Sequence, residues 1–107
     1  MDLKKLPTEQ RNPDTVSIDE VNTLEMLQMI NNEDKKVALC VEAHLPQIAA
    51  AIDAIAEKFI AGGRIVYCGA GTSGRMGFMD SAECPPTYGV PKDRVVSLMA
   101  GGKDAVS

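Results

Sequence analysis

The stretch "RIVYCGAGTSGRMG", from Arg64 to Gly77, decides the fold of this chain. Its first part, Ile65 to Cys68, is a short apolar run between glycines, which is typical of a buried parallel strand. A glycine loop of the form Gly-x-Gly-x-x-Gly follows, and we expect a short helix from about Ser73 to Ser81. A strand, a glycine loop and a helix in this order indicate the opening of an α/β fold.

A second strand is expected in "RVVSLMAGG", residues 94–102, because this apolar run also ends in glycines. Pro85-Pro86 and Gly89-Val90-Pro91 predict a long turn before it. Residues 63–107 are thus expected to form one βαβ unit, the beginning of an α/β domain that is incomplete. Two parallel strands cannot be covered on both faces, so exposed edges predict aggregation or dimerisation.

The amino-terminal part is expected to be an extended arm over residues 1–16 and a helical segment over 17–62. "SIDE", Ser17 to Glu20, has the pattern of a capping box and predicts that a helix starts there. Asn31-Asn32 is expected to separate this helix from a second one that ends near Leu45.

Pro46 is expected in the first turn of a third helix over 46–60, where its missing amide costs little. Gly62-Gly63 predicts the end of that helix. His44, just before it, has no second ligand at helical spacing, so we interpret it as a surface or capping residue.

Charge and composition exclude several classes of function. The chain has 11 basic and 15 acidic residues and a net charge of -4, which offers no attraction to nucleic acid. Met1 to Gln10 does not resemble a signal peptide, and the apolar stretch from Ile48 to Ile60 is interrupted by charges, so no membrane association is expected.

The three cysteines have no metal-binding spacing, so we expect reduced thiols in a cytoplasmic protein and no metal site. Cys84 directly follows Glu83 in the sequence and is therefore a candidate nucleophile. No histidine is near it in the sequence to activate the thiol, which disfavours that role.

The glycine loop, residues 69–75, predicts an anion site, because glycines admit close approach and a helix amino terminus offers free amides. A tight turn without a ligand is the alternative. A dinucleotide site requires an acid at the end of the second strand, and Ser97 to Gly102 has none. The adjacent hydroxyls of Thr72 and Ser73 suit a phosphate monoester and so favour a sugar phosphate. Arg75 either reaches that phosphate or is a solvated helix residue.

Two carboxylates follow the loop. Glu83 is expected between the short helix and the Pro-Pro turn, where it would serve either as an acid or base on a bound sugar or as a surface residue. Asp80 is expected to be structural, through a hydrogen bond at a helix end or turn.

Four segments in this order resemble the start of the N-acetylmuramic acid 6-phosphate etherase family: "TEQRNPDT", "IDEVNTLEMLQMINNEDKKV", "GAGTSGRMG" and "DSAECPPTYGVP". The resemblance covers about residues 8–102. The pattern is also similar to the glucokinase regulatory protein, a non-catalytic relative that binds fructose phosphates. "SAECPPTYG" argues against a third reading, an aldose-ketose isomerase with the same domain.

The resemblance implies a sugar isomerase (SIS) domain, which is a doubly wound parallel sheet flanked by helices and is truncated here. It also implies a cytoplasmic homodimer and a lyase of amino-sugar catabolism and peptidoglycan recycling. Its reaction cleaves the D-lactyl ether of N-acetylmuramic acid 6-phosphate without a metal or organic cofactor. Glu83 inherits the role of general acid, and Gly71, Thr72, Ser73 and Gly74 inherit phosphate binding. A raised pKa of Glu83, caused by burial beside Cys84 and the prolines, would suit that role.

The family continues well past Ser107, so we expect this chain to be an amino-terminal fragment. The resemblance places the glutamate that acts as base, and a second serine-rich phosphate loop, beyond the residues given. The chain as given is therefore expected to hold one of two catalytic carboxylates and half of a phosphate site.

Overall fold

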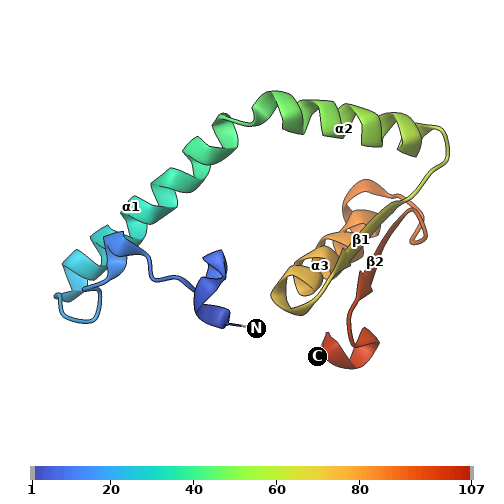
Figure 1. Cartoon of the computed structure of the whole chain (residues 1–107). Coiled ribbons are helices and arrows are strands. Elements are labelled where there is room, and N and C mark those ends of the chain that lie inside the picture. Colours follow the sequence, from blue (N-terminus) through green and yellow to red (C-terminus); the bar gives the residue numbers. More distant parts are fainter. Residues whose placement is uncertain (1, 107) are drawn as a thin grey trace. The chain divides into compact units, whose positions relative to one another are not determined.

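The computed structural model of this chain describes residues 2–106, and its contacts divide the chain into two compact units, Met1–Pro46 and Gln47–Ser107. The first unit holds three short 3-10 turns, η1 (Leu3–Lys5), η2 (Pro7–Glu9) and η3 (Pro13–Thr15), and the helix α1 (Thr23–Glu42) (Figure 1). The division that we expected at residues 16 and 62 stays a prediction.

Helix α1 begins later than its sequence suggested. Asn22 is the N-cap: its side chain accepts from the Glu25 amide at 3.0 Å, and the Glu25 carboxylate accepts from the Asn22 amide at 3.2 Å. The capping box predicted at Ser17–Glu20 was wrong, since these residues form turns. Asn is as good an N-cap as Ser, so the second Asx/Ser-x-x-Glu pattern competes with the first.

Helix α1 also continues through Asn31-Asn32, where we expected a break. An Asn costs a helix only about 0.7 kcal/mol relative to Ala, whereas a break leaves up to four unpaired carbonyls and four unpaired amides. At the far end of α1, the Nδ1 of His44 lies 2.8 Å from the Cys40 carbonyl oxygen, which confirms His44 as a capping residue.

Four side chains join η3 to α1 in the first unit. Lys36 forms ion pairs with Asp14 and with Glu33, both at 2.5 Å. Asn12 donates from Nδ2 to the Glu33 carboxylate at 2.9 Å. These contacts hold the turn Pro13–Thr15 against the helix.

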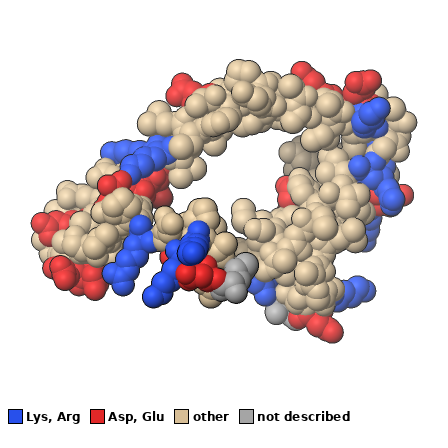
Figure 2. All heavy atoms as spheres, in the orientation of Figure 1, with Lys and Arg blue, Asp and Glu red and all other residues tan. Residues whose placement is uncertain are grey.

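The second unit contains nearly all of α2 (Leu45–Ile60), which starts and ends where the sequence indicated. Gly62 has a φ of 97°, which favours glycine, and the Gly63 amide donates to the Lys58 carbonyl oxygen at 2.9 Å, so the two glycines cap the helix. The surface over α2 is largely uncharged (Figure 2). Ile52 and Ile55 are about half exposed there.

The strands β1 (Ile65–Gly69) and β2 (Val95–Met99) form a parallel pair, in which Ile65 lies opposite Val95 and Gly69 opposite Met99. Helix α3 (Gly71–Tyr88) connects them and packs on both, and η4 (Gly102–Ala105) follows β2 (Figure 1). The predicted α/β class, with a parallel βαβ unit after amino-terminal helices, is confirmed.

Helix α3 is longer than predicted, and the prediction of a long turn at Pro85-Pro86 was wrong. Both prolines lie inside the helix, which ends at Gly89, whose φ is 69° and whose amide donates to the Pro85 carbonyl oxygen at 2.9 Å. Proline removes a helix hydrogen bond. Here both rings line a groove that Val95 also lines, where Pro85 is half-buried and Pro86 is exposed.

The core of the described part is small. Val95 and Ser81 are the buried hydrophobic and polar side chains. Within residues 2–106, no single helix is long and apolar enough to cross a membrane; α1 and α2 meet such a test only when counted together across the break between them.

Candidate functional site

The glycine loop joins β1 to α3 through the single residue Ala70, which is the N-cap of α3. Gly71 has a φ of 56°, a conformation that other residues adopt at a cost. A Cβ on Gly69 would lie 2.9 Å from the Gly74 Cα, closer than a carbon contact allows. Each glycine of the Gly-x-Gly-x-x-Gly pattern is therefore required by backbone geometry, whether or not a ligand binds.

The amino end of α3 offers donors to an anion. The amides of Gly71, Thr72 and Ser73 lie in its first turn, where no helix carbonyl is in reach. Thr72 and Ser73 are exposed, so two hydroxyls stand beside these amides. Gly74 differs, because it is buried and its amide donates to the Ala70 carbonyl oxygen at 3.2 Å. Phosphate binding at these four residues stays a prediction, and the geometry favours the first three as donors.

Arg75 has a contact that neither of our expectations included. Its Nη2 donates to the carbonyl oxygen of Ala105 at 3.0 Å, across 30 residues of sequence. The side chain thus links the first turn of α3 to η4, the segment that follows β2.

Asp80 accepts a hydrogen bond from the hydroxyl of Tyr67 at 2.6 Å. We expected a structural role for Asp80, but at a helix end or turn; instead Asp80 lies inside α3 and its partner is on β1. This hydrogen bond is the largest cause that raises the pKa of Tyr67, followed by burial and by electrostatic interaction with Asp80 and Cys84. Sequence reasoning missed Tyr67 entirely.

Glu83 lies within α3, not between a helix and a turn as we expected, and its side chain is exposed. An α-helix rises about 1.5 Å per residue, so Glu83 is about 18 Å along the axis from Gly71. The structure therefore does not bring Glu83 to the loop of its own chain. The burial expected from Cys84 and the prolines is also missing within residues 2–106: Cys84 and Pro85 are half-buried, while Glu83 faces solvent.

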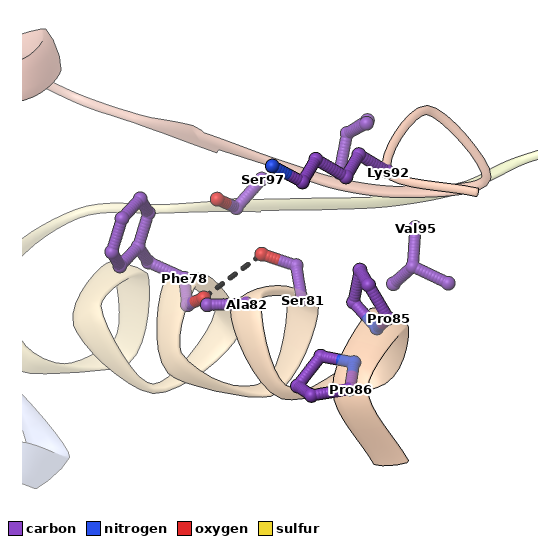
Figure 3. A pocket seen from close by; sticks show the side chains of 9 residues that line it. Phe78, Ser81, Ala82, Pro85, Pro86, Lys92, Val95 and Ser97 are labelled. Atoms are coloured by element: carbon purple, nitrogen blue, oxygen red, sulfur yellow. Dashed lines mark hydrogen bonds between the residues drawn. The ribbon is translucent and has the colours of Figure 1, made fainter. Parts of the chain in front are cut away.

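Two cavities flank α3. One, of about 360 Å³, lies between the end of β1 and the face of α3 that carries Ser73, Gly77 and Asp80. The other, a groove of about 440 Å³ along β2, is mostly apolar, with Phe78 and Pro85 among its walls (Figure 3). Its Ser81 hydroxyl donates to the Phe78 carbonyl oxygen at 2.9 Å, and since both cavities have mostly apolar walls, the lining favours neither of them for a polar ligand.

Metal-binding side chains do not gather in the described part: no group of three or more His, Cys, Asp or Glu residues in 2–106 could hold a metal ion. The three cysteines are free thiols, of which Cys40 and Cys68 are exposed and Cys84 is half-buried.

Comparison with known proteins gives two kinds of match. Residues 47–107 match the family described as the glucokinase regulatory protein N-terminal SIS domain. The whole chain is similar to proteins named N-acetylmuramic acid 6-phosphate etherase. The one from Vibrio vulnificus is 58% identical over 106 residues, which is 99% of this chain and 35% of the relative.

The etherase of Clostridium beijerinckii shows the same identity and coverage, 58% over 106 residues. That of Clostridium botulinum is 61% identical over 104 residues, which is 97% of this chain and 34% of the relative. The resemblance seen in the sequence motifs is thus confirmed. The chain spans about a third of the length of these curated relatives.

Proposed function

Since the chain belongs to the family of the glucokinase regulatory protein N-terminal SIS domain, we propose that the intact protein is an N-acetylmuramic acid 6-phosphate etherase. The observation that carries this proposal is the similarity, over 99% of the chain, to proteins of that name. The donors at the amino end of α3 support it, because three free amides and two hydroxyls suit the phosphate of a sugar.

The proposed reaction is an elimination followed by addition of water. A base takes the proton at C2 of the open-chain sugar, which the neighbouring aldehyde acidifies. The C3–O bond breaks, its electron pair goes to the lactate oxygen, and a general acid protonates that oxygen. D-lactate leaves as a C2=C3 double bond forms, and water then adds its hydroxyl at C3 while the base returns a proton to C2, which gives N-acetylglucosamine 6-phosphate. Atoms balance with water alone, so we propose no metal or organic cofactor.

Glu83 is the proposed general acid, and its carboxylate would then take the proton of the attacking water. The base is proposed to be a second glutamate outside these 107 residues.

The length of α3 supports a homodimer. The roughly 18 Å between Gly71 and Glu83 along the helix must be spanned by the Glu83 side chain, two hydrogen bonds and the substrate together, which one chain achieves only when all of them are extended. A second copy that brings its Glu83 to this loop would complete the site. We propose that the active sites are shared in this way and that the protein works in the cytoplasm, in peptidoglycan recycling.

A phosphosugar-binding regulator without catalysis is the second candidate, because the matching family is named after a regulatory protein. It would use the same loop and bind sugar phosphates, but it would release no D-lactate. Release of D-lactate from N-acetylmuramic acid 6-phosphate by the intact protein therefore separates the two.

The test compares the intact protein with Glu83→Gln and with Glu57→Gln, a control at another exposed helical glutamate. Loss of a general acid predicts a fall in kcat of about a hundredfold or more for Glu83→Gln and no change for the control. Normal lactate release by Glu83→Gln would exclude the proposed acid. No lactate release by the wild type, with tight binding of sugar phosphates, would favour the regulator.

Mixed dimers test whether the sites are shared. Ser73→Asp places a negative charge where we expect phosphate, so this variant and Glu83→Gln should each be inactive alone. After the two are unfolded and refolded together, half of the dimers are mixed and hold one whole site of two, so activity should return to about a quarter. Sites contained within single chains would give no recovery.

A further inference from the structure

We propose that the hydrogen bond between Tyr67 and Asp80 positions the amino end of α3, and that phosphate binding by Gly71, Thr72 and Ser73 depends on it. Tyr67 and Asp80 are thus positioning residues, which act through the loop and do not touch the phosphate. The inference rests on the proposed phosphate binding, but not on the etherase reaction.

Helix α3 meets β1 at successive levels along its axis. At the loop, Gly69 and Gly74 cross so closely that a Cβ on either would lie 2.9 Å from the backbone of the other. One helical turn further, Gly77 lies against the Tyr67 side chain, where an added Cβ would be 2.8 Å from the Tyr67 Cβ. These glycine contacts bring the two elements close together, and the hydrogen bond from Arg75 to Ala105 ties the same helix to η4.

The third level adds a side-chain hydrogen bond directly between α3 and β1. The Tyr67 hydroxyl donates to the Asp80 carboxylate at 2.6 Å, within the short range expected for a hydrogen bond to a charged acceptor. A directed bond of this kind fixes both the height and the rotation of α3 on β1, because its geometry tolerates little change.

The restraint reaches the loop because the intervening parts are short and stiff. Ala70 is the only residue between β1 and α3, and Asp80 lies less than three helical turns from the first free amide. The cavity of about 360 Å³ is bounded by the loop at Ser73 and by the Tyr67–Asp80 pair. A rotation of α3 would therefore redirect the free amides and change this cavity together.

The experiment measures binding of N-acetylglucosamine 6-phosphate and of inorganic phosphate to the intact protein by calorimetry, with KM and kcat for lactate release. Tyr67→Phe and Asp80→Ala each remove the hydrogen bond. Asp80→Asn removes the charge but keeps an oxygen that accepts from Tyr67. Tyr88→Phe is the matched control, because Tyr88 is 77% exposed.

A hydrogen bond to a charged group predicts that Tyr67→Phe and Asp80→Ala each weaken binding and raise KM about tenfold, with kcat unchanged. Asp80→Asn should bind phosphate with an affinity within about threefold of the wild type. The double variant of Tyr67→Phe with Asp80→Ala should bind at most about twofold more weakly than the weaker of these two single variants. If the substitutions damaged the fold in general, Asp80→Asn would not restore binding, and kcat would fall as well.

Wild-type binding by Tyr67→Phe, equal losses in Asp80→Asn and Asp80→Ala, or additive losses in the double variant would each overturn the proposal. Failure of the wild type to bind either phosphate probe would overturn it as well. A protein that binds the probes and shows the predicted variant series, but releases no lactate, would keep this inference and lose only the proposed etherase function.

Discussion

The guanidinium of Arg94 stacks over the ring of Phe59, 4.1 Å from its centroid, and donates from Nη2 to the Phe59 carbonyl oxygen. Its Nε donates to the Gly63 carbonyl oxygen at 3.1 Å. The side chain just before β2 thus binds one carbonyl in the last turn of α2 and one in the segment that follows the helix.

Arg94→Gln should therefore lower the free energy of unfolding by about 2 kcal/mol, since it removes two charge-assisted hydrogen bonds and a cation–π contact. Equilibrium unfolding in urea measures the change. Arg64→Gln is the control, because Arg64 is exposed and should change stability little. Equal effects of the two substitutions would mean that Arg94 does not link α2 to β2.

The ion-pair cluster around Lys36 predicts how the first unit responds to pH. Hydrogen bonds to Lys36 are the largest cause that lowers the pKa of Asp14 and of Glu33, and the same bonds raise the pKa of Lys36 from 10.5 to about 12. The carboxylates stabilise the folded state above their ordinary pKa values, and this contribution is lost as pH falls through their lowered values. The contribution of Lys36 is complete below pH 10.5 and is lost as pH rises towards 12.

Contact between Pro13–Thr15 and α1 should therefore be constant near neutral pH and weaken at both extremes. NMR titration of the Asp14 carboxyl should give a pKa that rises towards 3.8 in Lys36→Met but not in the neighbouring variant Lys35→Met. An unchanged Asp14 titration in Lys36→Met would show that the cluster does not form in solution. Because all three groups are exposed to solvent, added salt should also weaken the effect.

Local chemistry was sufficient to predict the βαβ unit. Ile65 to Cys68 and Val95 to Met99 are apolar runs rich in β-branched residues and bounded by glycines, and both are strands. The glycine loop was also predictable, because glycines between a strand and a helix mark a tight turn at which the backbones approach closely. Each of these signals lies within a few residues, which is the range over which one sequence is informative.

Errors arose where two local signals competed or where distant packing decided. Ser17 and Asn22 are both followed by a glutamate three residues later, and nothing local ranks Asn22 first. The prolines at 85 and 86 usually end a helix, but packing against β2 keeps them inside α3. The Tyr67–Asp80 bond was not predictable at all, since it depends on how closely α3 approaches β1.

Gly74→Ala and Thr72→Ala should separate packing from binding within one helical turn. A Cβ at Gly74 would lie 2.9 Å from the Gly69 backbone and 3.0 Å from the Met99 Cγ. Such overpacking costs about 2 kcal/mol, more than the roughly 1 kcal/mol that Ala gains over Gly in a helix, so the free energy of unfolding should fall.

Thr72→Ala removes part of an exposed side chain and introduces no clash, so the free energy of unfolding should not change. Only the binding of inorganic phosphate should become weaker. Urea unfolding and calorimetric phosphate titration of both variants check this. A stable Gly74→Ala variant would show that α3 can move away from β1 at the loop. Normal phosphate binding by Thr72→Ala would show that the Thr72 hydroxyl is not part of the proposed site.

Arg75 provides the last prediction, because its bond to Ala105 competes with the phosphate role expected from sequence. If the bond at 3.0 Å is its function, Arg75→Gln should speed hydrogen exchange of residues 102–106 and leave the affinity for inorganic phosphate unchanged. Arg75→Lys keeps the positive charge but loses the planar donor group, so it should behave like Arg75→Gln in exchange. If Arg75 instead binds phosphate, Arg75→Gln should weaken affinity, Arg75→Lys should preserve most of it, and the exchange of 102–106 should not change.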